Sequence, residues 1–222
     1  MKLGRLMLRA AVGGFFVGHG TQKLFGWFGG NGLGATASGF ESMGLRPGKL
    51  QATAAGVAES AGGAALALGY QTPLASATLI SVMLTAINRV HLKNGPWASK
   101  GGYEYNVVLL AAAAALAEAG PGGLSLDALR GKEKEGAKWG LLALALGVAG
   151  AAGAHVYSEQ QAAKAAPVPA SSNGSAATAP QPEPAPVPEP TQVNGNGNGE
   201  DAAQAADEAD AQSAGGEGDS EA

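Results

Sequence analysis

The sequence predicts an all-α fold: a polytopic membrane helical bundle followed by a disordered C-terminal tail. Five apolar segments of helical length alternate with short polar or glycine-rich breaks. All three Trp and all four Tyr fall at or just beyond the ends of these segments, where amphipathic rings favour the membrane interface. From Ser158 onward large apolar residues almost vanish. A soluble bundle would have no reason to sort its aromatic residues in this way.

The formal net charge of −4 is an average over two unlike parts of the chain. Residues 1–157 carry a net charge of +6, and residues 158–222 carry −10. The chain has no cysteine, which excludes disulfides, thiolate-bound zinc, cysteine-ligated iron–sulfur clusters and a cysteine nucleophile. We predict no metal site.

The first apolar segment runs from about Leu6 to Phe25, which is 20 residues or roughly 30 Å of helix, the thickness of the hydrocarbon layer. A rival interpretation is a cleaved signal peptide, with an apolar core at 10–17 and a cleavage-like triplet at 35–37. Lys23 and the aromatic residues of 25–28 lie between core and triplet, where a signal peptide has a short spacer of small residues. We therefore favour a membrane-spanning helix.

The loop of residues 26–48 is glycine-rich, and Phe40, Met43 and Leu45 predict a short amphipathic piece at the interface. Its Gly32-x-Gly34-x-x-Ala37 run superficially resembles a dinucleotide-binding fingerprint. No predicted strand precedes this run and no βαβ unit surrounds it. We discard that match.

The second and third segments, about 50–70 and 74–90, are joined by a short polar break, which predicts an antiparallel pair. Pro73 suits the start of the third helix. The second segment is rich in small residues that permit close helix packing, namely Ala54, Ala58, Gly62 and Gly69.

A fourth segment covers about 103–119, and a basic linker leads to a predicted fifth transmembrane helix at 139–156. Residues 158–222 are Ala/Pro/Gly-rich and acidic. Such a composition cannot offset the entropy of ordering, so we predict disorder there.

We predict that the N-terminus is cytoplasmic, although the cationic residues divide evenly between the two sides. Lys2, Arg5, Arg9 and the basic linker are interpreted as plain flanking charge. Lys23 and Arg89 instead lie at helix ends where they can belong to a site. This orientation places the acidic tail outside the cell.

Polar side chains collect at the membrane face where the first and third segments end and the second and fourth begin. His19, Gln22 and Lys23 share one helical face, and Glu59 lies about 14 Å deeper along its helix. Ionisable groups inside a membrane usually serve a function, although simple pairing or snorkelling also explains them. The candidate polar site comprises His19, Gln22, Lys23, Glu59, Asn88, His91 and Glu104.

The chain resembles the DoxX family of bacterial membrane proteins over about residues 5–130. The resemblance rests on the run Gly18–Gly30, the Ala58-Glu59 pair, His91-Leu92-x-Asn94-Gly95 and Gly101-Gly102-Tyr103-Glu104. It implies a DoxX-like four-helix membrane core at 1–130 in a bacterial cytoplasmic (inner) membrane. It also implies a loose association with redox chemistry, because the family takes its name from a subunit of a thiosulfate:quinone oxidoreductase.

Two functions follow as hypotheses, and neither assigns a catalytic residue. In the first, the protein is a subunit of a membrane redox system that binds quinone and a partner oxidoreductase. His19 and Glu59 would handle protons, and Lys23 or Gln22 would hold a quinone carbonyl. A narrower version has haem b bound between His19 and His91.

The alternative is a non-catalytic membrane scaffold or a small-molecule permeation protein, in which the same polar residues hold helices together or line a pore. The expected partners are the lipid bilayer and either a partner oxidoreductase or further copies of the chain, with no nucleic acid.

Overall fold

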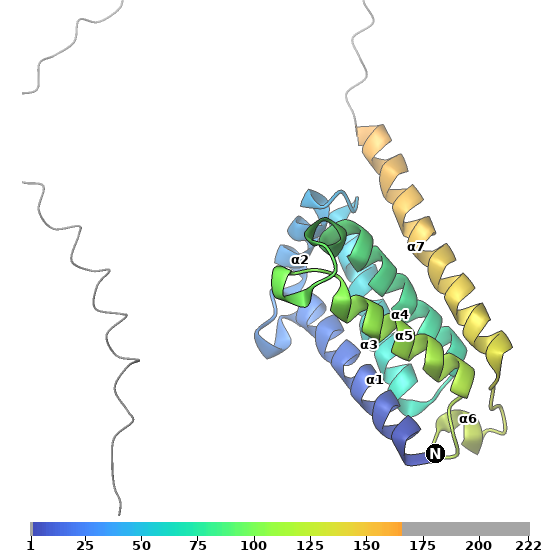
Figure 1. The fold of residues 1–222 in the computed structure, drawn as a ribbon. Coiled ribbons are helices and arrows are strands. Elements are labelled where there is room, and N and C mark those ends of the chain that lie inside the picture. Colours follow the sequence, from blue (N-terminus) through green and yellow to red (C-terminus); the bar gives the residue numbers. More distant parts are fainter. Residues whose placement is uncertain (1, 166–222) are drawn as a thin grey trace, which may run out of the picture. The chain divides into compact units, whose positions relative to one another are not determined.

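The computed structural model describes residues 2–165, and every regular element in that range is helical. The all-α class is therefore confirmed for this part of the chain. Short 3-10 turns lie between α1 and α2 and between α4 and α5, and α4 continues directly into a five-residue π-helical turn, Ile87–His91. The α-helices, shown in Figure 1, are α1 (Lys2–Phe25), α2 (Gly32–Ser42), α3 (Gly48–Leu68), α4 (Thr72–Ala86), α5 (Glu104–Ala119), α6 (Leu126–Leu129) and α7 (Ala137–Ala165).

The last helix corrects the predicted start of the tail. α7 continues to Ala165, so residues 158–165 are helical and not part of a disordered segment. Their sequence, Ser-Glu-Gln-Gln-Ala-Ala-Lys-Ala, contains mostly good helix formers. Ser158 is fully buried, and its hydroxyl donates a hydrogen bond to Ala154 O. The predicted disorder of 166–222 lies outside the described residues.

Two helices within residues 2–165 are long and apolar enough to cross a membrane by length and composition: Thr72–Asn94, which is α4 with its continuation, and α7. The other expected spans are not confirmed. α5 has only 16 residues, or roughly 24 Å of helix. α1 and α3 carry ionisable side chains along their length, such as Arg9 and Glu59.

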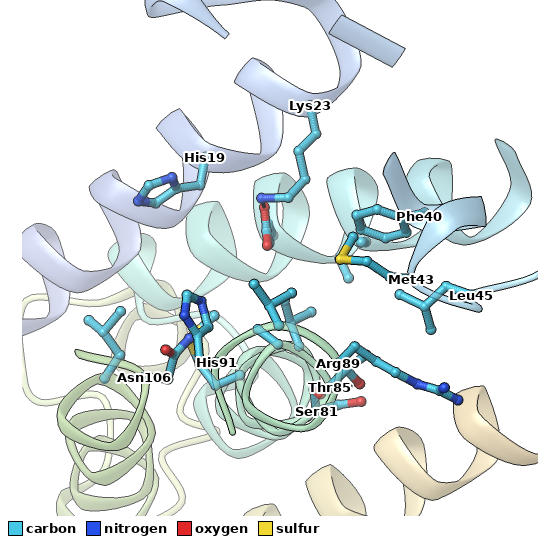
Figure 2. Close-up of a pocket in the computed structure, with 18 of the residues that line it drawn as sticks. His19, Lys23, Phe40, Met43, Leu45, Ser81, Thr85, Arg89, His91 and Asn106 are labelled. Carbon is cyan, nitrogen blue, oxygen red and sulfur yellow. Dashed lines mark hydrogen bonds and ion pairs between the residues drawn. The ribbon is translucent and has the colours of Figure 1, made fainter. Parts of the chain in front are cut away.

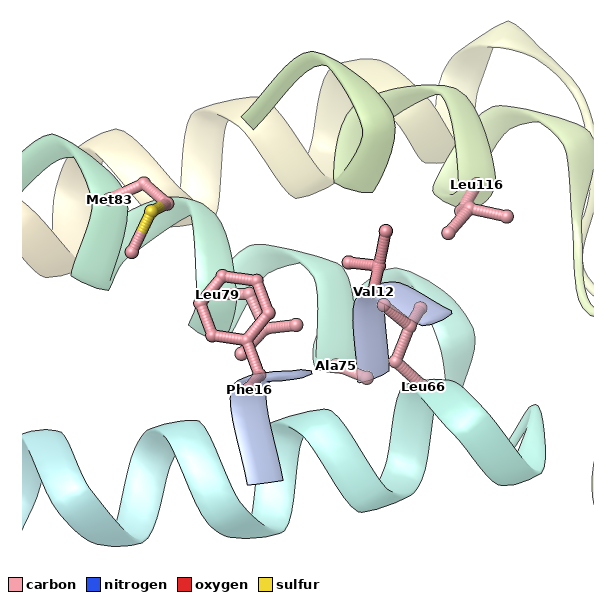
Figure 3. Packing of buried hydrophobic residues seen from close by; sticks show 7 residues of the cluster. All are labelled: Val12, Phe16, Leu66, Ala75, Leu79, Met83 and Leu116. Carbon is pink, nitrogen blue, oxygen red and sulfur yellow. The ribbon is translucent and has the colours of Figure 1, made fainter. Parts of the chain in front are cut away.

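The core lies where α1, α3, α4 and α5 face one another. Its buried side chains, which Figure 3 shows between these helices, are Val12, Phe16, Leu66, Ala75, Leu79, Met83 and Leu116. A second cluster joins α4 and α5 to α7 through Ile80, Ala113 and Ala143. Because α7 shares this packing, the structure does not isolate a separate four-helix core, and that finer division stays a prediction.

Glycines set the distance between α1 and α3. A Cβ atom built on Gly13 would lie 2.5 Å from Gly63 O, and one on Gly63 would lie 2.6 Å from Gly13 O. Gly20 and Gly56 make the same kind of backbone contact, seven residues later in α1 and seven residues earlier in the antiparallel α3. The two backbones therefore touch, and no larger side chain fits between them.

The glycines that make this contact are not the small residues singled out in the sequence, namely Ala54, Ala58, Gly62 and Gly69. Gly62 packs against Leu79 of α4, whereas Ala54 and Ala58 both line a cavity. The sequence marks α3 as rich in small residues, but it does not show which of its faces meets which neighbour.

Arg9 is not plain flanking charge, and that interpretation is wrong. The residue is only 2% exposed. Its guanidinium donates to Ala67 O at 3.0 Å, to Leu124 O at 2.5 Å and to Pro121 O. Carbonyls at a helix end have no partner within the helix. Arg9 therefore ties the end of α3 to the loop that follows α5.

We expect Gly13→Ala to destabilise the protein, by about 1–3 kcal/mol, because its methyl group would overlap the α3 backbone. The adjacent Gly14 has no atom within 4 Å of an added Cβ. Gly14→Ala should therefore be neutral or stabilising by up to about 1 kcal/mol. Thermal unfolding of both variants in detergent measures the difference, and equal melting temperatures would contradict the close α1–α3 contact.

Candidate functional site

A cavity of about 590 Å³ lies at the end of the bundle where α1 and α4 end and where α3 and α5 begin. Side chains from α1, α2, α3, α4, the π-helical turn and α5 line it, together with Ala154 of α7. Figure 2 shows His19 and Lys23 on one side of this space, with Phe40, Met43 and Leu45 beside them. The antiparallel order of the helices thus brings distant parts of the chain to one place.

The strongest polar interaction at the cavity is the ion pair of Lys23 and Glu59. Lys23 Nζ lies 2.7 Å from Glu59 Oε2. The Glu59 side chain is 3% exposed and that of Lys23 is 27% exposed. Removing two charges from water is costly, and a short charge-assisted hydrogen bond offsets part of that cost. The pair also joins α1 to α3 at the cavity wall.

The hydrogen bonds around His19 determine which nitrogen of its ring carries the proton. Gln22 Nε2 donates to Phe28 O at 3.2 Å, so Gln22 turns its Oε1 toward His19 Nδ1, also at 3.2 Å. An amide oxygen only accepts, and Nδ1 is therefore the protonated nitrogen of the ring. In neutral His19 the remaining nitrogen, Nε2, is an acceptor.

His91 is held in the same way from another element. It ends the π-helical turn and is half-buried, and its Nδ1 donates to Gly101 O at 2.7 Å. A carbonyl behind one ring nitrogen orients the imidazole and leaves Nε2 free to accept a proton or to bind a ligand. His19 and His91 both line the cavity.

The other three predicted site residues do not line the cavity. Gln22 links α1 to the following loop, and Asn88 is exposed. Glu104 is also exposed, and its carboxylate accepts a hydrogen bond from Ala98 N at 2.9 Å. The structure therefore brings together His19, Lys23, Glu59 and His91. Their roles stay predictions.

Asn106 on α5 is a cavity residue that the sequence reasoning missed. It is 9% exposed, and its Nδ2 donates to the thioether sulfur of Met83 at 3.4 Å. The sequence did contain a sign of it: Asn106 lies only three residues into the fourth apolar segment. Burying a polar group in such a segment is costly, so the residue could have been added to the candidate site. Ser81 and Thr85 of α4 line the cavity as well.

α7 completes one wall of the site. Ala154 lines the cavity, and Gln51 Nε2 of α3 donates to Ser158 Oγ at 3.0 Å. Arg89 of the π-helical turn contacts His155 Nδ1 and lies 3.4 Å from Glu159 Oε1. The Arg89 guanidinium is thus paired with α7 while its stem lines the cavity.

Residues 4–92 match the DoxX family. The chain contains a DoxX domain. The match supports membership of the DoxX family, and it covers the part of the expected resemblance up to residue 92 and not the part from there to about 130. It includes His19, Lys23, Glu59 and His91, but it ends before Asn106 and α7. Searches of curated proteins and of solved structures found no similar protein.

The outer surface of the helices suits a membrane protein of the DoxX family. Large apolar side chains point away from the bundle on several helices, among them Phe15 at 70% exposure, Val108 at 61% and Leu141 at 66%. Soluble proteins rarely expose extensive apolar surface, and a bilayer would cover it.

We expect Lys23→Met to destabilise the DoxX domain by about 3 kcal/mol, because it leaves the buried Glu59 carboxylate without its partner. Replacing Glu59 by Leu in the same variant should restore part of that loss. The pair of Arg46 and Glu41 is exposed on both sides, so Arg46→Met should cost at most about 1 kcal/mol. Unfolding in detergent measures all three variants, and equal losses for Lys23→Met and Arg46→Met would rule out a special role for the buried pair.

Proposed function

We propose that this DoxX protein is a subunit of a membrane redox system and that its cavity binds a quinone. The observation that carries the proposal is the ion pair of Lys23 with the buried Glu59, in a mostly apolar cavity that two oriented imidazoles also line. Sites for small organic molecules combine an apolar lining with a few polar groups that fix the orientation of the ligand.

The lining residues fit a quinone in size and chemistry. A volume of about 590 Å³ lies within the usual range for such ligands, roughly 300–1,000 Å³. The Lys23 ammonium can donate to a carbonyl oxygen, and Phe40, Met43 and Leu45 offer apolar contact to a ring or a tail. A bound quinone would supply the capacity to accept two electrons and two protons.

The side chains of this chain would manage the protons. His19 is exposed and lines the cavity, so its Nε2 can take up a proton from solvent while its Nδ1–H remains on Gln22. Glu59 holds Lys23 at the wall through the 2.7 Å contact. His91 offers a second Nε2 from another element.

Electrons would come from a partner oxidoreductase. The sequence has no cysteine and no flavin or nucleotide motif, and redox chemistry needs a cofactor that such a chain does not supply by itself. Haem b between His19 and His91 is the narrower alternative, because both rings keep Nε2 available.

We further propose a multi-pass arrangement in a bacterial cytoplasmic membrane, with the N-terminus in the cytoplasm and with α1, α3, α4, α5 and α7 as the spans. The exposed apolar side chains support the spans, and the basic linker before α7 supports the orientation. The cavity would then open toward the outer face of the membrane.

Protein purified in mild detergent should yield a quinone on organic extraction. His19→Ala and Glu59→Gln should each lower the recovered amount several-fold, because each removes a polar group from the cavity wall. Glu118→Gln, on an exposed position of α5, and Asn88→Ala, outside the cavity, serve as controls. An absorbance spectrum of the same samples tests for haem. Wild-type protein that is folded but empty would favour the scaffold or permeation alternative.

The absence of cysteine allows a direct test of topology. Lys93→Cys and Lys132→Cys introduce one thiol each at exposed positions on opposite sides of the proposed membrane. In intact cells a membrane-impermeant maleimide should label the thiol at position 93 and not the one at 132. The reverse pattern would invert the proposed orientation, while equal labelling of both would argue against a multi-pass arrangement.

A further inference from the structure

Asn106 has unused hydrogen-bonding capacity inside the cavity. An amide carries one acceptor oxygen and two N–H donors. Among the described residues its only side-chain partner is the Met83 sulfur, which is a weak acceptor. Whichever way the amide is turned, a strong polar atom remains without a protein partner at a residue that is only 9% exposed.

The packing around Asn106 does not explain why an amide side chain is present at this position. Its neighbours on the core side are apolar, because Met83 belongs to the hydrophobic cluster and Leu109 packs against that cluster. A leucine of similar volume would satisfy the same surroundings, and a buried polar group without a partner is destabilising. Asn106 also lines the cavity, which can hold a partner for its unused polar atoms.

Asn106 and His91 lie apart from the Lys23 and Glu59 pair. Asn106 comes from α5 and His91 from the π-helical turn, whereas the ion pair joins α1 to α3. Figure 2 shows His91 and Asn106 on the side of the cavity away from Lys23, whereas His19 lies on α1 with Lys23. The cavity thus has polar groups on two walls, in a lining that is mostly apolar.

We infer that Asn106 determines ligand specificity, because an N–H of its amide donates a hydrogen bond to a second oxygen of the ligand from the wall opposite the ion pair. This inference rests on the proposed function and narrows it. The ligand class is a small ring with two oxygen atoms at opposite ends, as in a 1,4-quinone, one oxygen facing Lys23 and the other facing Asn106. A ring with a single oxygen leaves the amide unpaired.

The test compares three probes on the full-length protein in detergent: tetramethyl-1,4-benzoquinone, 2,3,5,6-tetramethylphenol and tetramethylbenzene. They share one ring and four methyl groups and differ in carrying two, one or no oxygen atoms. Affinities are measured by equilibrium dialysis for wild type, Asn106→Leu and Asn88→Leu. Asn88 is the matched control, since it is an exposed asparagine outside the cavity.

We expect wild type to bind the quinone at least tenfold more tightly than tetramethylbenzene and severalfold more tightly than the phenol. Asn106→Leu should weaken quinone binding roughly three- to tenfold, the effect of one lost hydrogen bond. It should leave tetramethylbenzene unchanged or more tightly bound. Asn88→Leu should match wild type for all three probes.

Other outcomes overturn the inference in distinguishable ways. If Asn106→Leu weakens all three probes equally, Asn106 only shapes the cavity, and the quinone site itself stands. If wild type binds none of the probes, the proposed function fails as well. If Asn106→Leu does not fold, the inference is tested by the affinities of wild type for the quinone and for the phenol. Equal affinities for these two probes would refute a second oxygen contact.

Discussion

The close approach of α1 and α3 is the constraint on which the rest of the structure depends. Gly13 and Gly63 meet backbone to backbone, and Gly20 and Gly56 repeat the contact seven residues later in α1 and seven residues earlier in α3. Beyond these contacts, toward the end of α1, Lys23 reaches Glu59 at 2.7 Å. Larger residues at the glycine positions would separate the helices, and the buried carboxylate would then lose its partner.

The two ends of the bundle use cationic side chains in different ways. At one end Arg9 satisfies carbonyls of α3 and of the loop after α5, so its charge stabilises the packing of helices. At the other end Lys23 is paired with a carboxylate beside a cavity and retains some exposure. A guanidinium has five donors in a fixed fork and suits several carbonyls at once, whereas an ammonium keeps rotatable donors that a ligand can share.

The helix beyond the matched DoxX segment belongs to the same structural unit. α7 packs on α4 through the contact of Gly147 with Ile80 and that of Gly150 with Ser81. It also contributes Ala154 to the cavity and holds Arg89 through His155 and Glu159. The site therefore extends past the family segment, and any ligand preference of this chain depends on residues outside that segment as well.

The sequence by itself determined the helical class and the approximate position of each long helix, because apolar segment length and glycine or proline breaks are local properties. It also identified His19, Lys23, Glu59 and His91 as unusual, since ionisable groups in apolar segments carry a cost wherever they lie. Only the tertiary structure decided which of them meet. The partner of Glu59, the amide of Asn106 at the cavity wall and the burial of Arg9 depend on how the helices are rotated about their axes, and that rotation is set by contacts between segments far apart in the chain.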